Sequence, residues 1–163
     1  MAEKNPLSDE TAGNGDLRPL TVDDLERVVA IDRMVVGRSR RGFFETRLKG
    51  ALRDPHRFLF IGVCEAGDLV GFVLARVLEG EFGGNAAVAV LDAIGLDPGR
   101  RGEGYGRQLM SGLENVMRQK NVRELQSQLD WDNHALMGFL DAAGFRLAPR
   151  VVLSRPVAHG VEF

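Results

Sequence analysis

The chain has 163 residues, a length that suggests one domain able to bury a sizeable core. Lys and Arg total 21 against 23 Asp and Glu, so a net charge of −2 gives no electrostatic reason to expect nucleic acid or an anionic membrane as a partner. A lone cysteine, Cys64, excludes an intrachain disulfide, and without a long apolar run we expect a cytoplasmic protein.

The N-terminal part begins with a polar stretch, residues 1–16, which we expect to be a disordered tail ahead of a single domain over residues 17–163. Residues 17–20 are a short strand candidate. Thr21 and Asp24 have the spacing of a capping box, and the helix they open should run to about Val36 and stop at Gly37.

Residues 37–57 are the most basic part of the chain. Phe43, Phe44, Leu48 and Leu52 recur there at helical spacing and predict a second amphipathic helix. Its arginines are interpreted as a solvated face. The alternative is that they form a wall of a substrate mouth.

Three strands are predicted next. Residues 57–65 and 69–78 are apolar runs joined by a Gly-Asp turn, which predicts an antiparallel hairpin. An acidic loop over 79–85 leads to residues 86–96, a run with almost no charge that is typical of a strand buried on both faces.

A turn and a glycine-rich loop follow that strand. Asp97, Pro98 and Gly99 are turn residues, and Gly102, Gly104 and Gly106 open a helix that should end near residue 121. Residues without Cβ expose the unpaired amides of a first helical turn, where the helix dipole favours anions, so the loop predicts a phosphate cradle. The alternative is an ordinary glycine-rich turn before a helix.

The C-terminal part supplies a strand over 122–129, a helix ended by Gly144 and a last strand over 145–156. Pro149 interrupts that strand and favours an edge position. The order of elements predicts an α/β protein with a mixed sheet.

Motif spacing narrows the phosphate ligand. No Lys follows the glycines as in a Walker A loop, and the last glycine of a dinucleotide fingerprint is missing. The spacing Arg101-x-x-Gly104-x-Gly106 instead resembles the acyl-CoA pyrophosphate loop of the GNAT superfamily of N-acetyltransferases. The segment NHALMGFLDAAGF (133–145) and the hairpin GVCEAGDLVGFVLARV (62–77) resemble two other family segments. The resemblance implies a GNAT-like acyl-CoA N-acyltransferase fold, with a mostly antiparallel mixed sheet, helices on both faces and a splayed strand pair that binds CoA.

The same resemblance implies roles for named residues. The backbone of Ile94, Gly95 and Leu96 would bond the pantetheine arm of acetyl-CoA, and Asn133 would either reach that arm or cap its own helix. The pyrophosphate would lie on the loop, whose predicted contacts are Arg101, Gly102, Glu103, Gly104, Tyr105, Gly106 and Arg107.

The implied reaction is direct attack of a primary amine, on a small molecule or a protein, on the thioester. The ammonium must first lose a proton, which needs a general base or a water chain. Asp92 is the candidate base because it is a lone carboxylate in an apolar strand, two residues before Ile94 and so on its face. The alternative is an ion pair with an arginine such as Arg76. Glu79 and Glu81 are the other candidate bases.

One departure from the family pattern concerns the catalytic acid. The family often has a Tyr in the last helix, where this chain has Leu140. A non-catalytic or slow acyl-CoA-binding regulatory module is therefore an alternative function, and a domain for another phosphate ligand, such as a nucleotide, is a third. The three histidines are scattered, so no metal is assigned. An exposed last strand would allow a homodimer.

Overall fold

The computed structural model describes residues 14–80 and 83–157. The chain divides into two compact units, one ending at Gln128 and one beginning at Leu129. Among the described residues the strands are β1 (Asp16–Pro19), β2 (Phe58–Glu65), β3 (Asp68–Leu78), β4 (Val88–Leu96) and β5 (Leu125–Ser127), and the α-helices are α1 (Leu25–Val36), α2 (Arg41–Arg53), α3 (Tyr105–Gln119) and α4 (His134–Ala142). The first unit holds all of these except α4, which belongs to the second.

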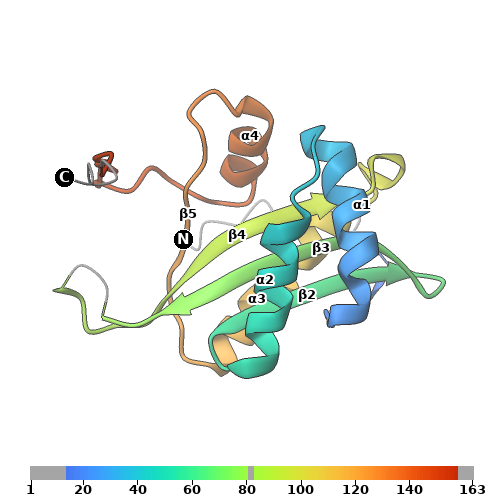
Figure 1. Cartoon of the computed structure of the whole chain (residues 1–163), viewed down its shortest axis with the longest axis horizontal. Coiled ribbons are helices and arrows are strands. Elements are labelled where there is room, and N and C mark those ends of the chain that lie inside the picture. The colour runs from blue at the N-terminus through green and yellow to red at the C-terminus, as the bar shows by residue number, and fades with distance from the viewer. Residues whose placement is uncertain (1–13, 81–82, 158–163) are drawn as a thin grey trace, which may run out of the picture. The chain divides into compact units, whose positions relative to one another are not determined.

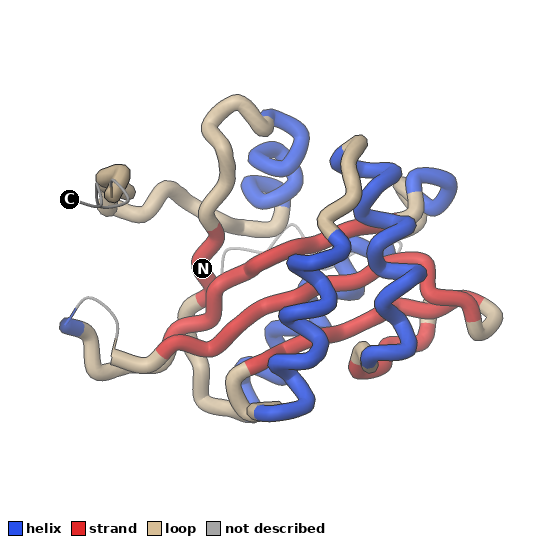
Figure 2. The backbone as a smooth tube through the Cα atoms, viewed as in Figure 1, coloured by secondary structure: helices blue, strands red, loops and turns tan. Residues whose placement is uncertain are grey.

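The first unit is built on one sheet with the strand order β1-β2-β3-β4-β5 (Figure 2). Neighbouring strands from β1 to β4 pair antiparallel. β2 and β3 are consecutive apolar runs joined by a short turn, whereas β1 pairs with β2 across the intervening α1 and α2. β5 returns after α3 and pairs parallel with β4. The mixed, mostly antiparallel sheet that was predicted is therefore confirmed.

Helices cover both faces of this sheet. Figure 1 shows α1 and α2 side by side across one face and α3 on the opposite face. The core under α1 and α2 contains the fully buried rings of Phe44 and Phe72, which meet edge to face at 5.5 Å between centroids. Leu48 joins this core as its helical spacing predicted, whereas Leu52, at the end of α2, is 68% exposed.

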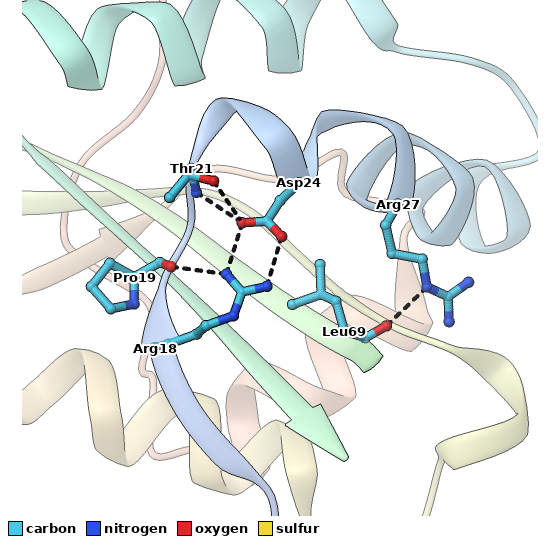
Figure 3. A network of polar contacts seen from close by, with 6 residues as sticks. All are labelled: Arg18, Pro19, Thr21, Asp24, Arg27 and Leu69. Carbon is cyan, nitrogen blue, oxygen red and sulfur yellow. Dashed lines mark hydrogen bonds and ion pairs between the residues drawn. The ribbon is translucent and has the colours of Figure 1, made fainter. Parts of the chain in front are cut away.

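The start of α1 is held by a polar network (Figure 3). Asp24 accepts two hydrogen bonds from the guanidinium of Arg18, at 2.7 and 2.8 Å, and one from the backbone N–H of Thr21 at 2.8 Å. The hydrogen bonds from Arg18 lower the pKa of the Asp24 carboxyl, and burial opposes them. The predicted capping residues thus tie β1 to α1, and Gly37 ends α1 with a left-handed φ of 80°.

Several predicted boundaries change. β4 alternates buried with partly exposed residues, so it is not buried on both faces, and β5 keeps three of its eight predicted residues. The strand predicted over 145–156 is wrong, because the backbone there forms no ladder with any described residue and its apolar side chains, such as Val151 at 83%, are exposed.

The N-terminal boundary also moves. The first 13 residues of the predicted tail lie outside the described part of the chain, but Gly15 donates its N–H to Gln108 of α3 at 3.3 Å. A Cβ on Gly15 would come within 2.5 Å of Val63, so glycine allows this close approach. A single domain over 17–163 stays a prediction. No helix in the described ranges has both the length and the apolar character needed to cross a bilayer.

Candidate active site

The loop between β4 and α3 begins with a braced turn. The Asp97 side chain accepts a hydrogen bond from the Gly99 N–H at 3.0 Å and another from Arg27 of α1 at 2.7 Å. These two bonds lower the pKa of the Asp97 carboxyl. Arg27 also donates to the Leu69 carbonyl at 2.8 Å (Figure 3). One guanidinium therefore joins α1 to the turn and to β3.

Two glycines of the loop have backbone angles that only glycine adopts easily. Gly102 has φ of 81° and Gly104, which caps α3, has φ of 83°. The left-handed region costs a residue with a Cβ on the order of 1 kcal/mol. A Cβ on Gly102 would have nothing within 4 Å, so the backbone is open to an approaching group there.

The amides of this loop are hydrogen-bond donors for which the described part of the chain offers no acceptor. Within the described ranges, no residue accepts a hydrogen bond from the backbone N–H groups of residues 102–106. They lie at the N-terminus of a 15-residue helix, where the dipole favours negative charge. Arg101 and Arg107 are exposed on either side. The loop therefore has the donors and the charge that a pyrophosphate requires.

The loop is anchored from below by Tyr105. Its ring is buried, and its hydroxyl donates to Glu65 Oε1 at 3.0 Å. Arg100 Nη2 lies 2.6 Å from the other carboxylate oxygen of Glu65. Burial, and then the Glu65 carboxylate, raise the pKa of the Tyr105 phenol. Sequence analysis missed Glu65, because only the fold brings the end of β2 to a loop 35 residues later.

β4 contains a bulge at Asp92. In the register with β3, Leu74 opposes Ala93 while Ala75 opposes Leu91, so Asp92 has no partner residue. Asp92 reaches Arg47 of α2, and Ala93 belongs to the core under α1 and α2, so these consecutive residues share a face. The expectation that Asp92 shares a face with Ile94 is wrong, because an inserted residue reverses the alternation of the strand.

Beyond the bulge β4 has a free edge. Pairing with β5 stops at Leu91 and Ser127, whereas pairing with β3 continues to Leu96. The Asp97 N–H donates to the Val70 carbonyl at 2.8 Å, which fixes the alternation of an antiparallel pair. It follows that Ile94 and Leu96 direct their N–H and C=O groups away from β3, where no strand in the described ranges pairs with them. Gly95 bonds toward β3 instead.

Gly95 has a packing reason to lack a side chain. A Cβ there would come within 2.7 Å of the Phe72 ring and 3.4 Å of Ile31. Of the three residues that the resemblance assigned to the pantetheine arm, Ile94 and Leu96 thus present backbone groups to the free edge, and Gly95 lets α1 and the Phe72 ring approach the strand.

The Asp92 carboxylate is held by two arginines. Arg76 of β3 donates to both oxygens, from Nε at 2.6 Å and from Nη2 at 2.9 Å, and Arg47 Nε lies 3.1 Å from Oδ2. The Asp92 side chain is 7% exposed, and its hydrogen bonds raise the pKa of Arg76. The predicted alternative, an ion pair with Arg76, is therefore present in the structure.

The remaining predicted residues are Glu79, Glu81 and Asn133. Glu79 is exposed directly after β3, and Glu81 lies outside the described residues. Asn133 caps α4, where its side-chain oxygen accepts from the Leu136 N–H at 3.2 Å. No group of three potential ligands among the described His, Cys, Asp and Glu residues is arranged to hold a metal ion.

The basic residues around α2 divide into two kinds. Arg38, Arg41, Lys49, Arg53 and Arg57 are exposed, as a solvated face requires. Arg40 and Arg47 are not: Arg40 makes a two-point ion pair with the buried Asp32 of α1, at 2.5 and 2.9 Å, and Arg47 turns toward the sheet. A carboxylate on the apolar side of α1 was the sequence signal for the first pair.

Comparisons with known proteins agree with this geometry. The model of the acetyltransferase (GNAT) family matches residues 28–145. A mycothiol acetyltransferase from Kocuria rhizophila is 30% identical over 110 residues, which are 67% of this chain and 36% of that protein. The chain thus spans little more than a third of the length of this curated relative.

Solved structures share the fold. AAC(6')-Iy, in complex with a bisubstrate analogue of CoA and acetylneamine, superposes with a TM-score of 0.73 at 20% identity, covering 89% of this chain and 99% of that one. The aminoglycoside 6'-N-acetyltransferase AAC(6')-Ih from Acinetobacter baumannii gives 0.74 at 17% identity, covering 90% and 100%. The matched family region includes the glycine loop, the bulged strand and its free edge, and from this we conclude that the chain belongs to the acetyltransferase (GNAT) family.

Proposed function

We propose that this protein is an acetyl-CoA-dependent N-acetyltransferase that acts on a primary amine. The observation that carries the proposal is the set of loop amides, residues 102–106, that find no acceptor among the described residues at the start of α3. Family membership and the free edge of β4 support it.

In this proposal the chain binds the cosubstrate mainly through its backbone. The loop amides hold the pyrophosphate of acetyl-CoA, and Arg101 and Arg107 add positive charge beside it. Ile94 and Leu96 bond the pantetheine arm as a further strand would. Asn133 is assigned to capping α4, since its side-chain oxygen already has a donor.

Acetyl-CoA supplies an activated acetyl group as its thioester. The amine nitrogen forms the new amide bond while the C–S bond breaks, the amine gives up a proton, and the thiolate gains one. A backbone N–H near Ile94 would stabilise the oxyanion. Because both Asp92 oxygens are engaged by Arg76, we assign Asp92 to positioning the two arginines and assign proton removal to Glu79, directly or through water.

Leu140 favours a second candidate function, a non-catalytic acyl-CoA-binding module. That position in α4 has no hydroxyl to protonate the thiolate. The two functions share the loop and the free edge but differ in turnover, so a binding measurement alone does not separate them.

The test combines calorimetry with an assay of free-thiol release. Titration with CoA, ATP and NAD separately should show CoA binding at least about tenfold tighter than either nucleotide, because the β4 edge bonds only a pantetheine arm. Thiol release from acetyl-CoA should then depend on an amine. Tight CoA binding with no release on a broad amine panel would establish the non-catalytic module, and a preference for ATP or NAD would overturn both functions.

A further inference from the structure

A cavity of about 230 Å³ lies on the α1/α2 face of the sheet, beside the Asp92 cluster. Its charged lining consists of Arg47 of α2, Asp54 after that helix, Arg57 before β2 and Arg76 of β3. Phe58, Val77 and Leu78 complete the wall. One water occupies about 30 Å³ of the liquid, so the space admits a small functional group with a few carbon atoms.

The charges in and beside this cavity do not balance. Arg47, Arg57 and Arg76 carry three positive charges, and Asp54 and Asp92 are the carboxylates that contact them. Both carboxylate oxygens of Asp92 accept hydrogen bonds from Arg76. Asp54 lies 4.0 Å from Arg57 Nε, a contact too long for a hydrogen bond. One positive charge is left without a carboxylate among the described residues.

Arg47 is where that excess is most costly. Its Nε is buried and, although 3.1 Å from Asp92 Oδ2, it lacks the geometry of a hydrogen bond to any described group. Its guanidinium lies 5.1 Å above the Phe43 ring, which restricts its orientation. A buried polar nitrogen without a hydrogen-bond acceptor is unfavourable, and an acceptor atom that reaches it would remove this penalty.

The cavity adjoins the proposed reaction site. Arg76 joins it to Asp92, and Asp92 is the bulged residue at which β4 leaves β5 and its free edge begins. The glycine loop lies past the other end of that edge. A cosubstrate bound along the edge would point its reactive end toward the bulge, so a molecule in the cavity would approach it from the opposite side.

We propose that this cavity binds a carboxylate group of the acceptor, so that the preferred substrate is a primary amine that also carries a carboxylate. This inference rests on the proposed function. Arg47 and Arg57 contact the carboxylate, since a guanidinium matches it with paired hydrogen bonds, and Asp92 keeps Arg76 in place beside them. A polycationic amine would instead meet three guanidinium groups.

The experiment uses matched acceptors: ω-amino acids from β-alanine to 6-aminohexanoate, each compared with its carboxamide. In thiol-release kinetics the carboxylate form should have a kcat/KM at least about tenfold higher than the amide, because a hydrogen bond to a charged group contributes about 1.5–3 kcal/mol. The difference should lie mainly in KM. Equal rates for the two forms, or faster amides, would overturn the proposal.

Variants identify the cavity as the origin of the preference. Arg57→Gln should fold normally, because the Arg57 side chain is 63% exposed and, among the described residues, makes only the long contact with Asp54. It should bring the ratio of kcat/KM for the carboxylate to that for the amide close to one. Arg47→Lys keeps the charge but loses the planar fork and should also reduce the ratio. Arg53→Gln, an exposed change on the last turn of α2, is the matched control and should leave it unchanged.

A binding measurement separates this inference from the proposed function. Glutarate, which has no amine, should bind the CoA-loaded protein in calorimetry, and Arg57→Gln should weaken it about tenfold. If CoA binds and an amine is acetylated but glutarate does not bind, the cavity proposal is wrong and the function stands. If neither CoA binding nor thiol release is observed, the proposed function itself fails.

Discussion

The two ends of β4 present opposite kinds of polar surface. At its C-terminal end the glycine loop presents backbone donors that no described residue satisfies, and the loop is held from beneath by the contacts of Glu65 with Tyr105 and Arg100. At the bulge the polar atoms belong to side chains, and most of their charge is already paired through Asp92.

This difference indicates how substitutions would affect the group that each end of β4 binds. Backbone amides suit an invariant group such as a pyrophosphate, because they stay in place whatever the side chains are. A cluster of arginines and carboxylates depends entirely on side chains, so one substitution alters the group it accepts. We therefore expect the loop to set the cosubstrate and the bulge end to set the acceptor, and the following changes test that division.

The largest effect is expected at the loop. Gly104→Glu places a carboxylate among the loop amides and a Cβ on a residue with φ of 83°, so CoA should bind at least about 100-fold more weakly in calorimetry. Gly67→Glu is the control, because Gly67 has φ of 88° in the β2–β3 turn and suffers the same backbone strain. Equal loss of CoA affinity in both variants would show that strain alone is responsible.

At the other end, Asp92→Asn should act first on stability. Breaking a buried ion pair by removing one partner costs about 3–5 kcal/mol, and because the Arg76 side chain is 29% exposed we expect roughly 2 kcal/mol in urea unfolding. Adding Arg76→Gln should restore part of it, since one of the two arginines that lose Asp92 is then removed and only Arg47 is left. If Asp92→Asn keeps full stability and CoA affinity but abolishes turnover, Asp92 is the general base and its assignment here is wrong.

A smaller effect is expected from Tyr105→Phe, which removes the hydroxyl that donates to Glu65 while the buried ring stays. The loop should loosen, and CoA affinity should fall about fivefold, as for the loss of one hydrogen bond. Acceptor KM at saturating acetyl-CoA should not change. A change in acceptor KM would mean that the two ends of β4 are coupled, against the division drawn above.

The smallest effect concerns the turn that leads to the loop. The Asp97 pKa is lowered in the folded protein, so its ionised form stabilises the fold above the ordinary Asp value of about 3.9, and that contribution disappears as the pH falls through the lowered pKa. Asp97→Asn should therefore reduce stability at pH 7 by a few tenths to about 1 kcal/mol and at pH 2 hardly at all. Asp23→Asn, an exposed change, is the control. An equal loss at both pH values would exclude this ion pair as the cause.

Local chemistry explains what was predictable from the sequence. Gly37 ends α1, Thr21 and Asp24 begin it, and the turn at Asp97 follows β4, because each signal acts within a few residues. The glycine loop was predicted for the same reason. The fold class followed from the order of such segments, and the comparisons confirm it.

What was not predictable depends on contacts across the sheet. An extra residue in a strand leaves no local signature in the sequence. Simple alternation therefore placed the Asp92 side chain on the same face as Ile94, which is the wrong face. Residues 145–156 have strand composition, but a strand needs a partner, and their described backbone has none. The engagement of Arg47 and Glu65 likewise required the tertiary structure.

The bulge also determines which length changes β4 can survive. On either side of Asp92 the pleat is out of phase by one position, which is how Ala93 and Gly95 come to lie under α1 and α2 while Ile94 and Leu96 do not. Deleting Asp92 would leave Leu91 opposite Ala75 and Ala93 opposite Leu74 in a regular ladder, so Ala93 and Gly95 would keep their face, whereas one residue inserted beyond the bulge would turn the rest of the strand over. The strand can therefore lose the extra residue of the bulge, together with the Asp92 ion pairs, and keep its packing, but it cannot gain a residue beyond the bulge without rebuilding what packs on both of its surfaces.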